Sequence, residues 1–101
     1  MEIQEIRRKA QAGQWAMSRH ARKFAGQRCI RDVEVREALC EAELLENYPD
    51  DSRGPSCLVL GFTQRQRPLH VVCGGDPVRT LVIITTYEPK PPDWVNPWTR
   101  R

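Results

Sequence analysis

The strongest constraint on the fold comes from the segment Arg67–Pro89, RPLHVVCGGDPVRTLVIITTYEP. Two runs rich in Val, Ile, Leu and Thr flank Gly-Gly-Asp-Pro, a pattern typical of two strands joined by a turn. The second run, Thr80–Glu88, is the most apolar segment of the chain, so we expect it in the middle of a sheet. His70 and Tyr87 lie at the margins of this hairpin, where they suit either a catalytic site or a stable core with two ordinary polar residues.

Three helices are predicted ahead of this hairpin. In Glu2–Ala12 the apolar residues recur with helical spacing, and Gly13 is suited to end the helix. Ser18 is suited to cap a second helix over Arg19–Gln27. The third helix is predicted at Asp32–Glu41, where apolar residues recur at i, i+3, i+4 and i+7.

From Glu43 onward the hydrophobic period changes from about 3.6 residues to 2, which indicates strands. Trp15–Met17 is expected to be only a short extended approach to the second helix. Helices followed by strands predict an α+β fold, with N-terminal helices packed on one face of a small antiparallel four-stranded sheet. The predicted strands are Leu44–Tyr48, Cys57–Thr63, Pro68–Gly74 and Thr80–Glu88. A length of 101 residues suits one such domain, placed at residues 1–89.

The last segment, residues 90–101, is predicted to be a C-terminal tail outside the domain. Glu88–Trp98 is rich in proline and holds Trp94 and Trp98. Proline at this density disfavours both helix and strand ladder, so we expect an extended, polyproline-like chain. The two tryptophans either dock back on the domain or stay exposed for a partner.

Composition limits the classes of function and location. No apolar run approaches the roughly 20 residues that cross a bilayer, and the first ten residues lack the apolar core of a signal peptide, so we expect a cytoplasmic protein. The four cysteines are widely spaced, with no C-x-x-C pair, so neither a metal nor a cofactor is expected. Without a secretion signal, disulfides are also not expected, and Cys40, Cys57 and Cys73 are interpreted as small core residues.

The net charge of +3 is lower than that of a dedicated nucleic-acid binder, but its distribution is uneven. Acidic residues collect in Glu34–Asp51. Basic residues crowd the first third of the chain, where they suit either a phosphate backbone or ordinary solvated helix surfaces: Arg7, Arg8, Lys9, Arg19, Arg22, Lys23, Arg28 and Arg31.

Two histidines and one tyrosine are the candidate catalytic residues. His20 lies between Arg19 and Arg22 at a predicted helix start, which offers an imidazole, cations and free N–H groups to a phosphate. His70 and Tyr87 are the candidates on the strands, and an ordinary structural role is the alternative for each of the three. Thr85 is expected on the same strand face as Tyr87. Arg65 and Arg67 lie in a hairpin connection, where they suit either a bidentate phosphate clamp or ordinary exposed turn positions.

Six motifs occur in order: Ser18–Arg22 (SRHAR), Arg28–Ile30 (RCI), Glu46–Pro49 (ENYP), Leu58–Gly61 (LVLG), Arg67–Val72 (RPLHVV) and Ile84–Pro89 (ITTYEP). In these motifs the chain resembles a bacterial and archaeal family of domains of unknown function, often encoded beside zinc-finger antitoxins of the MqsA/YgiT kind. That family in turn resembles the RelE, MqsR and BrnT toxins, whose helices pack against a small antiparallel sheet. The chain departs from the family pattern at Cys29, usually a glycine, and at Arg31, usually a Ser or Thr cap.

The resemblance implies a type II toxin, a metal-independent endoribonuclease that cleaves mRNA, free or on the ribosome, and is silenced by a zinc-finger protein antitoxin. It carries His20, His70 and Tyr87 over as the polar positions of interest, beside Thr85 or Thr86. The proposed roles are His20 as base or acid, Tyr87 or His70 as its counterpart, and Arg65 or Arg67 on the phosphate. The alternatives are a non-catalytic protein-interaction module and a degenerate toxin with the same fold.

Overall fold

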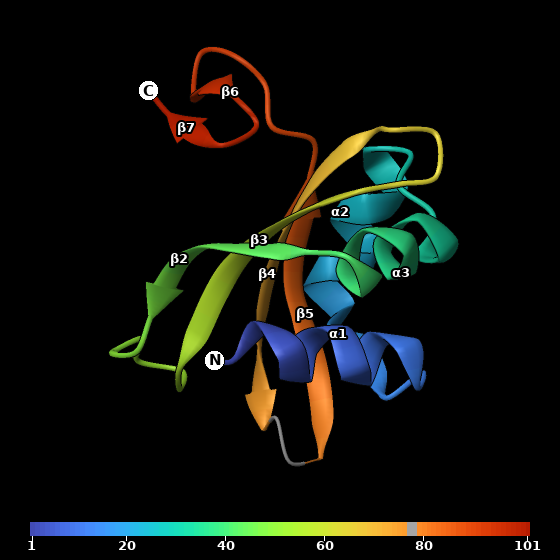
Figure 1. The fold of residues 1–101 in the computed structure, drawn as a ribbon, viewed down its shortest axis with the longest axis vertical. Helices are drawn as coiled ribbons and strands as arrows, with labels where there is room; N and C mark the ends of the chain where they lie inside the picture. Colours follow the sequence, from blue (N-terminus) through green and yellow to red (C-terminus); the bar gives the residue numbers. More distant parts are fainter. Residues whose placement is uncertain (77–78) are drawn as a thin grey trace.

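The computed structural model describes residues 1–76 and 79–101. Three helices and a short strand precede the main strands, and a small hairpin ends the chain (Figure 1). In chain order the elements are α1 (Ile3–Gln11), β1 (Trp15–Met17), α2 (Arg19–Gln27), α3 (Asp32–Cys40), β2 (Glu43–Tyr48), β3 (Ser56–Phe62), β4 (Pro68–Asp76), β5 (Thr80–Tyr87), β6 (Trp94–Asn96) and β7 (Thr99–Arg100).

The α+β class is confirmed, but the main sheet has five strands, in the order β1-β5-β4-β3-β2, and is mixed. The additional strand is Trp15–Met17, predicted only as an extended approach, which pairs in parallel with Leu81–Ile83. The neighbouring pairs from β5 to β2 are antiparallel, as predicted. Because β1 flanks β5, the central strand is β4 and not β5. The turn predicted at Gly-Gly-Asp-Pro lies partly outside the described residues.

The three helices cover one face of this sheet (Figure 1). Alternate strand residues point into the core beneath them, where they meet apolar side chains of all three helices. The approach is closest at Gly61 of β3, where a Cβ atom would lie 1.9 Å from the carbonyl oxygen of Ala38 in α3. This core includes Ile6, Ala21, Val35, Leu39, Val59, Val71 and Ile83. No helix among the described residues is long and apolar enough to cross a membrane.

Arg67 joins the ends of α2, α3 and β5. Its guanidinium donates to the carbonyl oxygens of Arg28 (3.2 Å) and Cys29 (3.0 Å), which follow the last residue of α2. It also pairs with Glu34 of α3 (3.3 Å) and with Glu88 (3.1 Å). Cys29 itself has φ 57, in the left-handed region that favours glycine, so the backbone is strained at this junction.

Glu34 gives this junction a pH dependence. A hydrogen bond from the Arg31 backbone N–H, then Arg67, lower the pKa of Glu34 from its ordinary value of 4.5. A carboxyl group whose pKa is lower in the folded than in the unfolded state stabilises the fold at pH values above its unfolded-state pKa. This stabilisation is lost as the pH falls through the folded-state pKa. We therefore expect the wild-type protein to lose more stability than Glu34→Gln when pH falls from neutral to well below 4.5.

Urea unfolding of both proteins at the two pH values measures the difference. Glu41→Gln, at the exposed end of α3, is the matched control and should follow the wild type. Equal losses in the wild type and in Glu34→Gln would contradict the role assigned to Glu34.

The C-terminal tail is not the extended polyproline-like chain predicted from its composition. Residues 94–100 form the β6–β7 hairpin, which lies away from the helices (Figure 1). The sequence leaves open whether the two tryptophans dock on the domain or stay exposed. Trp94 is buried, at 4% exposure, whereas Trp98 is 53% exposed. The tail therefore packs against the sheet, on the face opposite the helices.

Candidate functional site

His70 lies at the centre of a cluster on this second sheet face. It is directly opposite Leu60 of β3 and Tyr87 of β5 in the strand register, and its side chain is fully buried. Its Nε2 lies 2.7 Å from the carbonyl oxygen of Pro97, and its Nδ1 lies 3.3 Å from the Tyr87 hydroxyl. The Trp94 ring meets it edge-on, with centroids 4.2 Å apart. The hairpin therefore holds the imidazole in one orientation.

The partners of His70 define its tautomer. A carbonyl oxygen can only accept, so Nε2 carries a proton and donates it to Pro97. Burial lowers the pKa of His70, with the bond to Pro97 acting in the opposite direction, so we assign a neutral ring near neutral pH. Nδ1 then has a free lone pair and accepts from the Tyr87 hydroxyl. The proton of Tyr87 is therefore directed at His70.

Tyr87 connects this buried pair to an open cleft. The cleft has a volume of about 400 Å³ and lies where the end of β5 meets the hairpin. Burial raises the pKa of Tyr87, while the charge of Arg100 and a hydrogen bond from Trp94 act in the opposite direction. The cleft is lined by Arg28, Tyr87, Glu88, Lys90, Pro91, Asp93, Trp94 and Arg100.

Cations outnumber acids in this cleft. Arg28, Lys90 and Arg100 line it against Glu88 and Asp93, and Glu88 is already paired with Arg67. An adjoining hollow of about 230 Å³ shares Arg28, Tyr87, Glu88 and Lys90 with this cleft and adds Arg67. A phenol beside several cations suits an anionic group such as a phosphodiester better than a neutral ligand.

Arg100 is held in place from two sides. Its guanidinium donates to both oxygens of Glu46, at 2.7 and 3.1 Å, and lies 4.7 Å from the Trp94 ring centroid. Glu46 also accepts from the Tyr48 hydroxyl. These bonds, Arg100 first, lower the pKa of Glu46, while burial and the bond to Glu46 raise the pKa of Tyr48 to about 12. The carboxylate is therefore ionised near neutral pH and fixes Arg100 at the cleft.

Arg28 reaches the cleft from the end of α2. It donates to the Thr86 carbonyl oxygen (2.9 Å) and to the Thr85 hydroxyl (3.4 Å), so Thr85 positions a cation beside Tyr87. Its guanidinium lies 5.1 Å from the Phe24 ring centroid, and the His20 ring lies 4.6 Å from the same centroid. His20, Phe24 and Arg28 therefore form a stripe along α2 that leads to the cleft.

The structure brings His70, Tyr87 and Thr85 together but places His20 at the far end of this stripe. His20 and Arg28 are eight residues apart, about 12 Å of helix rise. The basic candidates also separate: Arg22 pairs with Asp32 (3.4 Å), and Arg67 is engaged by two carboxylates and two carbonyls. Arg19 and Arg65 are exposed on the surface of the molecule.

Sequence reasoning missed four residues of the cluster: Arg28, Glu46, Trp94 and Arg100. Arg28 and Glu46 stand inside motifs quoted for the resemblance, and Arg28 is also one of the basic residues that suit a phosphate backbone. Trp94 and Arg100 belong to a tail that was predicted to lie outside the domain, and no local pattern connects them to β4.

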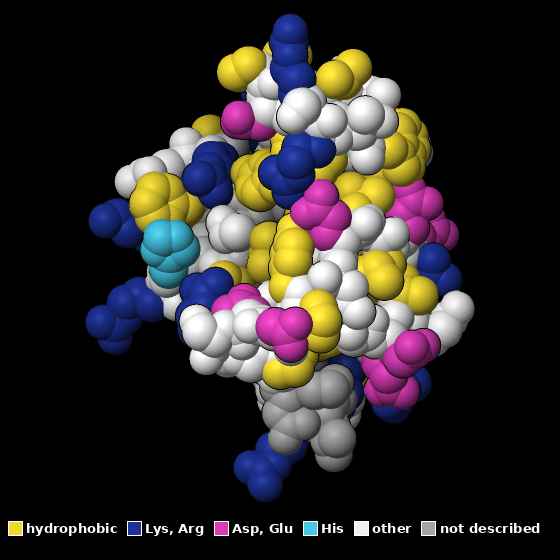
Figure 2. Space-filling model, turned by 90° about the vertical axis from the view of Figure 1, so that its left-hand side faces the viewer, with side chains coloured by type: hydrophobic (Ala, Val, Ile, Leu, Met, Phe, Trp, Pro, Cys, Tyr) yellow, Lys and Arg dark blue, Asp and Glu magenta, His cyan; other side chains and the backbone are white. Residues whose placement is uncertain are grey.

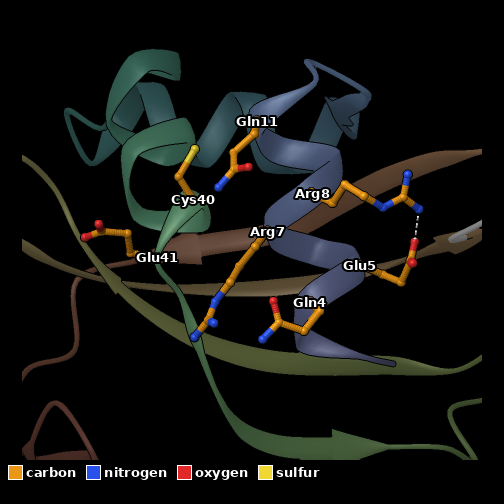
Figure 3. A pocket seen from close by; sticks show the side chains of 7 residues that line it. All are labelled: Gln4, Glu5, Arg7, Arg8, Gln11, Cys40 and Glu41. Atoms are coloured by element: carbon orange, nitrogen blue, oxygen red, sulfur yellow. Dashed lines mark hydrogen bonds and ion pairs between the residues drawn. The ribbon is translucent and has the colours of Figure 1, made fainter.

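Two larger hollows lie elsewhere and are less suited to chemistry. One, of about 680 Å³, lies between α1 and the end of α3, and Figure 3 shows Arg8 turned towards Glu5 beside it. Its Arg7 donates to the Ala42 carbonyl oxygen (2.8 Å), so both arginines are engaged. The other, of about 520 Å³, is lined by α3 and the β3–β4 connection and contains neither a histidine nor a tyrosine. Neither hollow is lined by a histidine or a tyrosine.

The surface charge is divided on the face turned to the viewer in Figure 2. Lys and Arg side chains gather on its left and near the hairpin at the top, while most Asp and Glu side chains lie in the centre and on the right. Within residues 1–76 and 79–101, no group of three or more His, Cys, Asp or Glu side chains could hold a metal ion.

Comparison with known proteins gives one match. Residues 17–88 match the sequence profile of a family described as a domain of unknown function, DUF4258. No curated protein and no solved structure matches the chain. The match begins at Met17, the last residue of β1, and covers α2, α3 and β2 to β5, but it ends before the hairpin that completes the cleft.

Proposed function

Because this chain belongs to DUF4258, a family of domains of unknown function, we propose its activity from the cleft itself: a metal-independent endoribonuclease that cleaves RNA by attack of a ribose 2′-OH. The observation that carries the proposal is Tyr87, whose hydroxyl is bonded to buried His70 and which lines a cleft together with Arg28, Lys90 and Arg100. A phosphodiester needs this combination of a proton-transfer pair and cations.

The hydrogen-bond directions give each residue a role. The Tyr87 oxygen accepts the proton of the 2′-OH while its own proton passes to Nδ1 of His70, whose Nε2 stays bonded to Pro97. Arg28 and Arg100 hold the phosphate and stabilise the charge that develops on its oxygens. Lys90 lines the same cleft and has a transferable proton for the leaving 5′-oxygen.

This assignment changes the roles of two sequence candidates. His20 stands about 12 Å of helix rise from Arg28, so we propose that it contacts RNA along α2 and does not exchange protons at the cleft. Arg67 is saturated by carboxylates and carbonyls, and we propose that it fixes the junction beneath the cleft. Arg19, Arg22 and Arg65 remain proposed contacts for flanking phosphates.

The test uses an RNA that the protein cuts and the same RNA with a single 2′-deoxyribose at the cut site. We expect the substituted site to lose all cleavage, because the attacking nucleophile is missing, while other sites are still cut. The products at the natural site should carry a 2′,3′-cyclic phosphate and a 5′-hydroxyl. Cleavage at the deoxy position, or a 5′-phosphate product, would contradict the mechanism.

We propose the toxin role from the resemblance alone. A RelE-like fold and a zinc-finger antitoxin are proposed for this chain on the same basis. The substrate in that role is mRNA, free or ribosome-bound. Co-expression with a zinc-finger antitoxin of the MqsA/YgiT kind should restore growth that the chain alone arrests. Growth arrest that persists with an antitoxin shown to bind would contradict the pairing.

The second candidate function is a non-catalytic protein-interaction module. Val95 is 63% and Trp98 53% exposed on the same hairpin, which gives an apolar surface for a partner. If the chain is such a module, Tyr87→Phe should bind the partner protein as tightly as the wild type does. The wild-type protein should then cut no RNA, whether the RNA is free or on ribosomes.

A further inference from the structure

Two cysteines that the proposed reaction does not use face each other inside the sheet. Cys57 of β3 and Cys73 of β4 are direct partners in the antiparallel register, and both side chains are fully buried. They lie on the helix-covered face, in the core cluster. Opposed residues of an antiparallel pair have Cα atoms roughly 4.5–5.5 Å apart, within the range that a disulfide spans.

The two thiols also interact chemically. The Cys73 thiol donates to the carbonyl oxygen of Val71 (4.0 Å), and the interaction between the two thiols lowers the pKa of Cys57 and, together with burial, raises that of Cys73. The pair is therefore unequal, with Cys57 as the better nucleophile. Half-buried Met1 contacts the pair, with its Sδ 4.0 Å from the Cys57 Sγ.

We propose that Cys57 and Cys73 form a reversible cross-strand disulfide, with a small peroxide as the oxidant. The Cys57 sulfur attacks one peroxide oxygen, the O–O bond breaks, and a sulfenic acid and one water form. The Cys73 sulfur then attacks the Cys57 sulfur, the S–O bond breaks, and a second water leaves with the Cys73 proton. Two thiols lose two electrons and two protons, and hydrogen peroxide becomes two waters.

The bond would fasten β3 to β4 three positions from His70, on the sheet face opposite the candidate site. Residues 58–72 lie within the closed loop, and His70 is among them. Closing a loop of this length restricts the unfolded chain, so the midpoint of thermal unfolding should rise by about 5 °C or more on oxidation.

The test uses the full chain with Cys29→Ser and Cys40→Ser, which removes the exposed and half-exposed thiols and keeps the pair. After hydrogen peroxide treatment, the protein is denatured in N-ethylmaleimide and its intact mass is measured. We expect a monomer that has lost two hydrogen atoms and takes up no maleimide. Reduction should restore both thiols, and only the oxidised form should show the higher unfolding midpoint.

The matched controls add Cys57→Ser or Cys73→Ser to the same background, and each should leave one thiol that alkylates or oxidises singly. Two thiols that still alkylate after peroxide treatment would overturn the proposal, provided that peroxide oxidises them when the protein is unfolded in urea. Sulfinic acid or intermolecular dimers in place of the internal bond would also overturn it. The mass measurement on the pair-only protein does not depend on whether either serine variant folds.

Discussion

Replacing Tyr87 by Phe lowers the rate of RNA cleavage by about 10²- to 10⁴-fold, the usual contribution of a positioned proton-transfer group. The substitution removes one oxygen and leaves the ring that packs edge-on against His70, with centroids 5.3 Å apart. It also leaves the cleft cations in place, so RNA binding should change little. The measurement is the single-turnover cleavage rate, with circular dichroism and RNA affinity recorded for the same sample.

Tyr48→Phe is the matched control for this prediction. Tyr48 is a half-buried tyrosine on the same sheet face, where it donates to Glu46 and does not line the cleft. It should cleave RNA at close to the wild-type rate. Equal losses in the two variants would mean that the cluster acts through stability, and no loss in Tyr87→Phe would remove Tyr87 from the reaction.

Replacing Gly61 by Ala should produce a large loss of stability. The new Cβ would lie 1.9 Å from the Ala38 carbonyl oxygen and 2.7 Å from its Cα, and both are backbone atoms of α3. A side-chain rotation cannot relieve this clash, so α3 must move away from β3. We expect the free energy of unfolding to fall by about 4 kcal/mol, at the upper end of overpacking effects.

Gly26→Ala, in contrast, should stabilise the protein. Gly26 is exposed in α2, and no atom lies within 4 Å of its added Cβ. Alanine there should raise the free energy of unfolding by roughly 0.5–1 kcal/mol through helix propensity. Urea unfolding of the two variants separates a specific close approach at Gly61 from a general intolerance of substitution.

The elements with strong local patterns could be predicted from sequence. Arg19–Gln27 forms a helix with the predicted bounds, because Ser18 accepts from the Ala21 N–H and the apolar residues lie on one face. The strand pairing of β3, β4 and β5 follows from short connections between alternating segments. That pairing also places His70 opposite Tyr87, so this half of the cluster could be anticipated.

The elements without a local pattern could not be predicted from the sequence. β1 has three residues, too few to show a period, and its strand pairing depends on the distant segment Leu81–Ile83. In the tail, composition was misleading because position matters more: Pro91 and Pro92 precede the hairpin, and Pro97 lies in its turn, where a missing N–H costs nothing.

The remaining half of the cluster depends on long-range contacts. Arg100 reaches Glu46 across 54 positions of sequence, and Arg28 reaches Thr86 across 58. Hydrophobic periodicity describes apolar residues and therefore indicates neither pairing. Arginines are also too frequent in the first third of the chain to single out Arg28. The basic neighbours of His20 make it a catalytic candidate in the sequence. The fold instead places His20 on α2, at the end of the stripe that is farther from the cleft.

The most direct test of the cleft as a catalytic site is cleavage of an end-labelled mRNA by the purified protein in excess EDTA, beside Tyr87→Phe and His20→Ala. We predict cutting by the wild type, a loss of at least about 10²-fold in Tyr87→Phe, and a smaller loss in His20→Ala. Cleavage that requires added metal, or that is lost in His20→Ala and retained in Tyr87→Phe, would contradict the account.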